Sequence, residues 1–354
     1  MTEVDALSRG WSARAPHVLR AERLDLTQWR DGHHDGSLAL GGVAWGLPRA
    51  DVDVDADSGG LAALDTPLLG PTQPWVDAWL TRGGALRSGR SGSVQWRTDG
   101  HWAFGQLNLP EAQGSLEQAA YRAYRDVFAA LEDCGCPQLL RLWNYLPRIN
   151  ADGGGLERYR QFNIGRQQAF MDAQRDPFDG APAACALGTA GATPGGLSVR
   201  FLAGRLAPKP VENPRQVSAY RYSRAYGPRA PTFSRAALAD AGGGQLALLV
   251  SGTASIVGEH SVHHGDVVAQ TQETLRNLQA VIDSAHRGCS ARYRLADLHP
   301  TVYVRHAADA VVVGQVLAQA EPSWRDAPCV QADICRADLL VEIEAHAFAP
   351  GALA

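Results

Sequence analysis

Lysine is almost missing from this sequence: Lys209 stands alone beside 32 arginines in a chain of 354 residues. Schiff-base catalysis and a Walker-type phosphate loop both depend on a lysine, so these chemistries have essentially no candidate residue. A G-x-G-x-x-G run after a strand-like segment is missing too, and with it the signature of a dinucleotide site.

The chain also lacks an apolar run near the ~18 residues that a membrane helix needs, and its N-terminal segment lacks the apolar centre of a secretory signal. The formal net charge is -4 and the pI is about 6.3, so there is no basic field for nucleic acid. With 45% hydrophobic and 20% charged residues, the sequence predicts a cytoplasmic protein with a sizeable core. No membrane or nucleic-acid partner is expected.

The six cysteines are scattered without a C-x-x-C pair, which favours neither a disulfide framework nor a zinc site. Most are expected to be reduced packing residues, because free cysteine is commonly buried. We expect no cofactor and no metal.

Two segments carry the same helical pattern. Residues 114–136 and 265–289 align so that five core positions fall in register at a spacing of four, four, three and four. This spacing is one face of an amphipathic helix. Ser115 with Gln118 begins the first helix as a capping pair, and Asp266 begins the second. The sequence therefore predicts a duplicated unit, with the function where the two copies meet.

Strand-like segments surround both helices. They are residues 102–109 and 246–257 before the helices, 139–146 and 301–304 after them, and finally 197–202 and 339–344. Each copy is expected to run strand, helix, strand, strand. This order favours an α+β fold with helices on one face of a sheet.

Arginine and tyrosine are concentrated between the two copies. A planar guanidinium presents forked donors that match a carboxylate, and a tyrosine hydroxyl beside it fixes a second oxygen. The cluster predicts a site for a small polyanionic acid, although any single arginine could instead lie over apolar surface or form a salt bridge at the rim. The candidate substrate-binding residues are Arg148, Arg160, Arg166, Arg215, Tyr220, Tyr222 and Arg224.

The run GDVVAQTQETLRNLQAVI, followed by TVYVRHAAD and CVQADICRADLLVEIEA, resembles the RidA/YjgF fold, a small α+β unit that ordinarily trimerises and binds ligands between subunits. The larger set LWNYLPRIN, ERYRQFNIGR, YGPRAPTFSRA, SGTASIVG and ADICRADLLVEIEA resembles the chorismatase family, in which RidA-like domains lie in one chain. The match is closest to the branch that makes hydroxybenzoates from chorismate.

The resemblance implies three RidA-like units with pseudo-threefold symmetry, in a monomer or in a homo-oligomer. With residues 208–214 as the best linker, we place a degenerate unit at residues 1–90, a central domain at 91–213 and a C-terminal domain at 214–354.

The resemblance also assigns a catalytic acid. Cleavage of chorismate needs an acid that protonates the vinyl methylene carbon of the enolpyruvyl ether, and a carboxyl can do this near neutral pH only if burial raises its pKa. Glu342 and Glu344 alternate onto the same face of one strand, so the pattern alone does not choose between them. The family motif selects Glu342.

Two further residues are implied in the choice of product. A cysteine at position 335 goes with aromatisation, and a glycine at position 254 goes with committed 3-hydroxybenzoate formation. This chain has Cys335 but Ala254, so a mixture of 3- and 4-hydroxybenzoate is expected. The ERYRQFNIGR match favours Arg160 and Arg166 as the carboxylate clamps.

Three alternatives stay open. An imine deaminase of the RidA kind is weakened, because small RidA deaminases carry an arginine where this chain has Ala327. A non-catalytic protein that binds a small acid shares the same fold and cleft. A non-haem iron oxygenase could use His264 and Asp266 with a third ligand from His299, His306 or His346, but Asp266 already has a structural role as a helix cap.

Overall fold

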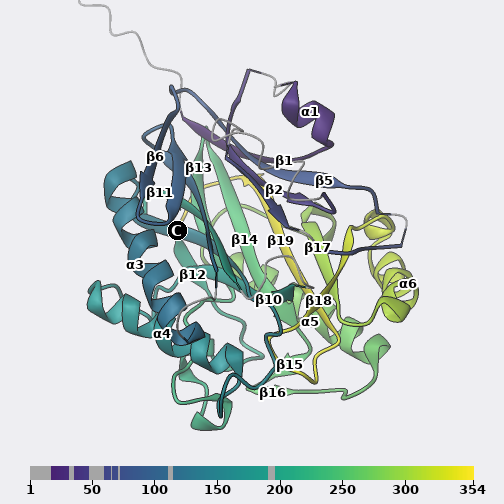
Figure 1. Cartoon of the computed structure of the whole chain (residues 1–354). Coiled ribbons are helices and arrows are strands. Elements are labelled where there is room, and N and C mark those ends of the chain that lie inside the picture. Colours follow the sequence, from purple (N-terminus) through teal and green to yellow (C-terminus); the bar gives the residue numbers. More distant parts are fainter. Residues whose placement is uncertain are drawn as a thin grey trace, which may run out of the picture.

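The computed structural model describes residues 17–31, 36–47, 60–64, 66–70, 72–110, 115–189 and 196–354. In these residues a 13-stranded sheet and a four-stranded sheet lie inside the molecule, and the longer helices lie outside them (Figure 1).

Most of the chain is two copies of one unit. The first copy comprises β6 (Arg87–Ser91), β7 (Val94–Thr98), β8 (Trp102–Leu109), α3 (Leu116–Cys134), β9 (Gln138–Tyr145), α4 (Arg158–Asp172), β10 (Ala183–Thr189) and β11 (Leu197–Gly204). The second copy comprises β12 (Lys209–Val211), β13 (Ala236–Gly242), β14 (Gln245–Ala254), α5 (Val267–Ala285), β17 (His299–Val304), α6 (Ala310–Ala320), β18 (Cys329–Asp333) and β19 (Val341–Pro350).

The two copies have the same strand order. It is β6-β7-β8-β11-β9-β10 in the first and β12-β13-β14-β19-β17-β18 in the second, and an antiparallel pairing of β10 with β18 joins them into one sheet. In each copy one pair is parallel, β9 with β10 and β17 with β18. The predicted duplication and the α+β class are confirmed.

The expected order of strand, helix, strand, strand was incomplete. Each copy has a second helix and three more strands. In the first copy these are α4 with β6, β7 and β10, and in the second they are α6 with β12, β13 and β18. The sequence did not reveal α4 because its buried face is largely polar, with Arg158, Gln161 and Asn163 among its buried residues. The repeat begins at β6 and at β12, slightly before the boundaries near 90 and 213, and the division into domains stays a prediction.

The two predicted helices begin and pack as expected. The Ser115 hydroxyl accepts a hydrogen bond from the backbone N–H of Gln118, and the Asp266 carboxylate accepts one from that of Ala269. The first helix ends at Gly135, whose φ of 74° is readily adopted by glycine. All five predicted core positions of the first helix are buried, and so are the last four of the second. They are Leu116, Ala120, Tyr124, Val127 and Leu131 in the first helix and Thr271, Leu275, Leu278 and Ile282 in the second. These two helices therefore fix the outer layer of each copy.

A smaller N-terminal part closes the other face. It consists of β1 (Val18–Leu24), α1 (Leu26–Arg30), β2 (Leu38–Trp45), β3 (Leu61–Leu64), β4 (Leu68–Leu69) and β5 (Trp75–Arg82). Trp45 and Trp79 from this sheet share one core with Trp102 and Trp143 from the first copy and Tyr303 from the second. The N-terminal sheet and the sheet faces of the two copies thus meet in one central core. This is the arrangement expected for three units with pseudo-threefold symmetry of which the first is degenerate.

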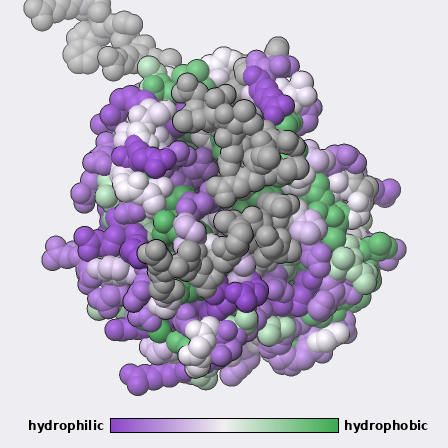
Figure 2. Space-filling view, in the orientation of Figure 1, coloured by the Kyte–Doolittle hydropathy of each residue, from purple (hydrophilic) through white to green (hydrophobic). Residues whose placement is uncertain are grey.

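The surface is mainly polar over α3 and α4, whereas apolar residues gather near α6, where Val311 is exposed (Figure 2). Within the described residues, no helix is both long and apolar enough to cross a membrane.

Candidate active site

A cavity of about 290 Å³ lies where the two copies meet. Residues 157–160 at the start of α4 supply one wall, and residues 222–235 supply a second. The C-terminal part of β14 and the segment that enters β19 supply the rest. The complete lining is Glu157, Tyr159, Arg160, Tyr222, Tyr226, Pro231, Phe233, Arg235, Gly252, Ala254, Ile256, Cys335, Arg336, Ala337, Asp338 and Glu342.

Glu342 is the buried acid of this cavity. It is the second residue of β19, opposite Ala254 of β14 and Tyr303 of β17, and only 3% of its surface is exposed. Its carboxyl lies against the backbone of Gly252, where an added Cβ would be 1.9 Å from Oε1. Burial, followed by the charge of Glu344, raises the pKa of Glu342 to about 8. Glu342 is therefore largely protonated at neutral pH.

Glu344 lies on the same strand face but has a different environment. Its Oε2 accepts a hydrogen bond from Arg141 Nη2 at 2.8 Å, and its Oε1 accepts one from the Tyr303 hydroxyl at 2.8 Å and one from Trp143 Nε1 at 3.3 Å. These three partners hold the Glu344 carboxyl in place. Glu344 lines a separate small cavity beside the N-terminal sheet. The structure thus separates the two glutamates that the strand pattern could not distinguish.

Two arginines face the cavity with donors left over. Arg235 donates to the Val217 carbonyl and to the Tyr222 hydroxyl, and Arg336 donates to the Glu259 carbonyl. Arg235 Nε and Arg336 Nη2 are buried without a hydrogen-bond partner among the described residues. A buried donor that lacks a partner is costly, and both residues line the cavity, so these two guanidinium groups are suited to an anionic ligand.

Aromatic rings and small side chains complete the lining. The Arg336 guanidinium lies 4.0 Å from the ring centroid of Tyr226 and 5.0 Å from that of Tyr222. Burial, and next the charge of Glu342, raises the pKa of the Cys335 thiol to about 12, which keeps it neutral. Ala254 is 3% exposed and adjoins Glu342 in the strand register.

The structure brings only part of the predicted site together. Glu342, Cys335, Ala254, Arg160 and Tyr222 all line the cavity. The remaining five predicted residues are absent from its lining, namely Arg148, Arg166, Arg215, Tyr220 and Arg224.

Local contacts explain where most of these five residues lie instead. Arg166 is 2% exposed and packs in the core of the first copy, with its guanidinium 5.2 Å from the ring centroid of Tyr124. Arg215 is bound to Glu273 and Asn277 on α5. Tyr220 packs under Arg221.

Arg148 and Arg224 are exposed. The sequence prediction missed Arg235 and Arg336 because it was drawn from the segments rich in arginine and tyrosine, and neither residue belongs to one. Both nevertheless lie within the family motifs, in the SRA and ICRAD parts.

The residues considered for iron do not form a common cluster. Asp266 caps α5, and His264 is largely exposed with its Nδ1 3.4 Å from the Asp338 carboxylate. His346 is half-buried and stacks on His299 at 5.4 Å between ring centroids. In the part of the chain that the structure describes, no group of three or more His, Cys, Asp and Glu side chains is arranged to hold a metal ion.

Known proteins match this chain along most of its length. A family model described as "Chorismatase FkbO/Hyg5-like, N-terminal" matches residues 77–203. The chain is 37% identical over 297 residues to a Streptomyces hygroscopicus protein named 3-hydroxybenzoate synthase, covering 80% of this chain and 85% of that protein. It is 38% identical over 328 residues to a chorismatase of Streptomyces rapamycinicus, covering 91% of each.

A solved crystal structure of a chorismatase has the same fold, with a TM-score of 0.81 and 31% sequence identity. The similarity covers 94% of this chain and 99% of that one, so it includes both copies.

Proposed function

Because the chain belongs to the chorismatase family, we propose that it removes pyruvate from chorismate in the cavity between its two copies, with Glu342 as the proton donor. One observation carries this proposal. The same cavity holds a carboxyl whose pKa is raised to about 8 and two arginines with unbonded buried donors. An enolpyruvyl dicarboxylate requires both an acid that is protonated near neutral pH and groups that bind carboxylates.

The chemistry needs one proton and returns it. Glu342 gives its proton to the vinyl methylene carbon, which leaves a carboxylate on Glu342 and an oxocarbenium centre on the substrate. Pyruvate then departs, and the proton that the ring loses on aromatisation restores the acid. Hydroxybenzoate and pyruvate together contain all the atoms of chorismate, so no oxidant or other co-reactant is needed.

The product depends on which oxygen leaves with pyruvate. If pyruvate takes the ether oxygen of C3, the hydroxyl on C4 remains and the product is 4-hydroxybenzoate. In the second route the C4 hydroxyl adds to the oxocarbenium carbon and releases its proton. The C4–O bond and the bond from that carbon to the C3 oxygen then break, pyruvate leaves with the C4 oxygen, and loss of the proton on C3 gives 3-hydroxybenzoate. We propose that the neutral thiol of Cys335 and the methyl group of Ala254, both against the reacting centre, limit the entry of water and leave both routes open.

Substrate carboxylates are assigned to the arginines of the cavity. Arg336 and Arg235 have the free buried donors, and Arg160 lies at the rim, where its Nε is 3.2 Å from the Glu157 carboxylate. A guanidinium can hold a carboxylate through two parallel hydrogen bonds. Tyr222, Tyr226 and the other aromatic residues of the lining supply flat surface for the substrate ring.

The direct test is to incubate the purified chain with chorismate, separate the aromatic products by chromatography and measure pyruvate enzymatically. Equal amounts of pyruvate and hydroxybenzoate support the proposal. Binding of chorismate with no pyruvate after hours would leave a protein that only binds a small acid. The imine deaminase alternative gains no support, since Ala327 lines a different cavity beside α6.

We further propose that one chain is sufficient for activity, because the cavity lies between the two copies of the unit that this chain carries. Activity that co-elutes with a monomer in size-exclusion chromatography supports this, and activity confined to a larger assembly opposes it. The cytoplasmic location stays a prediction from the sequence.

A further inference from the structure

Helix α5 carries a buried polar row on the side that faces the cavity walls. Gln270, Glu273 and Asn277 are 0%, 4% and 0% exposed, and their spacing of three and four places them along one side of the helix. The equivalent positions of α3 in the first copy are Ala119, Arg122 and Asp126. Buried polar side chains persist when their hydrogen bonds are satisfied, so the contacts of this row indicate its purpose.

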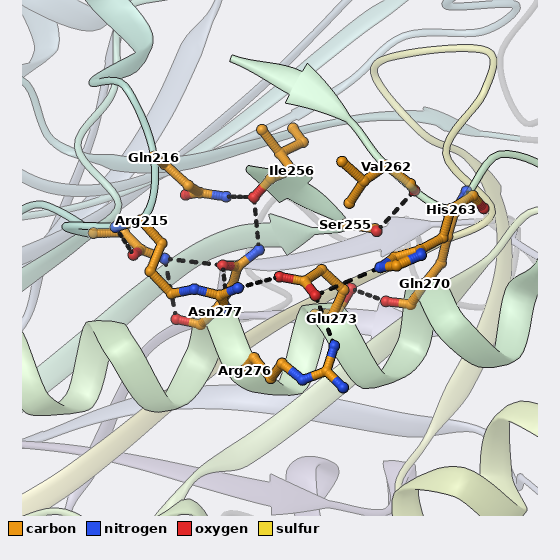
Figure 3. A network of polar contacts seen from close by, with 12 residues as sticks. Arg215, Gln216, Ser255, Ile256, Val262, His263, Gln270, Glu273, Arg276 and Asn277 are labelled. Atoms are coloured by element: carbon orange, nitrogen blue, oxygen red, sulfur yellow. Dashed lines mark hydrogen bonds and ion pairs between the residues drawn. The ribbon is translucent and has the colours of Figure 1, made fainter. Parts of the chain in front are cut away.

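Asn277 holds the end of β14. Its Nδ2 donates to the carbonyl oxygen of Ala254 at 3.0 Å. The same Nδ2 donates to the Ile256 oxygen at 2.9 Å, and Gln216 Nε2 donates to that oxygen at 3.0 Å (Figure 3). Both Ala254 and Ile256 line the cavity. The pairing of β14 with β19 shifts register between Val250 and Thr253, just before this segment. A helix side chain therefore fixes the backbone where the regular ladder is interrupted.

The other two residues of the row hold two more walls. Gln270 donates to the Asp338 carbonyl at 2.9 Å and accepts from the Leu340 N–H at 2.8 Å, just before β19 begins. Glu273 binds Arg215 at 2.5 Å, and Arg215 Nη1 also donates to Asn277 Oδ1 at 3.2 Å (Figure 3). Arg215 begins the segment that leads to Tyr222 and Tyr226. One side of α5 thus supports three walls of the cavity from behind.

We infer that Asn277 is a positioning residue that sets the product choice of this enzyme, by fixing the Ala254 wall relative to Glu342. The inference rests on the proposed function. Ala254 and Glu342 are opposite each other in the strand register, so a displacement of the Ala254 backbone changes the space beside the protonated substrate. A displacement near ~1 Å is enough to change the relative rates of competing steps.

The test measures product partition rather than rate. The products compared are 3-hydroxybenzoate, 4-hydroxybenzoate and the dihydrodiol that forms if water adds to the cationic ring. Their fractions are measured with chorismate for the wild-type protein, Asn277→Ala and Gln216→Ala. Partial unfolding lowers the total rate but leaves the partition of the folded molecules unchanged. A change in partition therefore reports on the position of the wall and not on stability.

Val281→Ala is the matched control. Val281 lies one turn further along α5, is buried in the core of the second copy and is not among the residues that line the cavity. We expect Asn277→Ala to change the partition by about three-fold or more and Gln216→Ala to change it in the same direction by less. Val281→Ala should leave it unchanged.

Three outcomes overturn the inference. The first is a wild-type partition in both Asn277→Ala and Gln216→Ala, and the second is an equal change in Val281→Ala. The third applies if Asn277→Ala does not fold: an unchanged partition in Gln216→Ala then overturns the inference by itself. A wild-type protein that binds chorismate without consuming it removes the proposed function and this inference together, whereas unchanged partition with normal turnover removes the inference alone.

Discussion

Glu344→Gln tests whether a charge that does not touch the substrate sets the acidity of Glu342. Two residues apart on one strand face, the two carboxyls are about 7 Å apart. At an effective dielectric constant of ~20 their repulsion is about 2 kcal/mol, equivalent to a pKa change of about 1–2. Glu344 is 5% exposed, so solvent screens this interaction little. Glutamine removes the charge and keeps an oxygen for Arg141.

The expected result is a displaced pH profile. A general acid works while it is protonated, so kcat/KM is highest below the pKa of Glu342 and falls as pH rises through it. For the wild type this decline is expected near pH 8, where the pKa of Glu342 lies. For Glu344→Gln it should move about 1–2 pH units towards acid, with activity recovering at low pH.

Tyr303→Phe is the matched control for that variant. It removes one hydrogen bond to Glu344 and leaves the charge in place. The decline of its kcat/KM with rising pH should therefore stay near that of the wild type. The assay is the initial rate of pyruvate release at low chorismate concentration between pH 5 and 9. A folded Glu344→Gln protein whose decline coincides with the wild type would refute the reasoning.

Three further predictions concern the cavity lining. Arg336→Ala should weaken chorismate binding by about 2–5 kcal/mol, with only partial rescue by Arg336→Lys, as measured by calorimetry; full rescue would argue for a diffuse positive field. Gly252→Ala places a methyl group 1.9 Å from Glu342 Oε1, so turnover should fall by about ten-fold or more while chorismate still binds. Unchanged turnover would show that the Glu342 carboxyl can move away from the methyl group and still donate its proton. Cys335→Ala and Ala254→Gly should each change the ratio of 3- to 4-hydroxybenzoate in chromatographic assays, and the same ratio in both would remove these residues from product choice.

The sequence predicted the outer helices α3 and α5 because the signals that define a helix lie within a few residues of one another. The helical spacing and the caps at Ser115 and Asp266 act within a few residues, so α3 and α5 begin where the sequence placed them. The family motif, and not the alternation of the strand, identified Glu342. Its burial could be expected from its apolar neighbours in β19.

The roles of the arginines could not be predicted in this way. Arg141 pairs with Glu344 across 203 positions of sequence, and such a partner leaves no local signal. Arg166 belongs to a motif that suggested a clamp, yet α4 turns it into the core of the first copy. Arg336 reaches the cavity because the β10–β18 junction brings the ends of the two copies together. Dense arginine thus indicated an anion site, but not which guanidinium lines it.

The central claim is that Glu342 supplies the proton that releases pyruvate, and Glu342→Gln tests it most directly. Glutamine keeps the shape of the side chain but has no acidic proton. The measurement is steady-state pyruvate release from chorismate, together with the dissociation constant of chorismate for the same protein. We predict that turnover falls by about 10²–10⁴-fold while chorismate binding stays close to that of the wild type. Turnover near the wild-type value in Glu342→Gln would contradict the account.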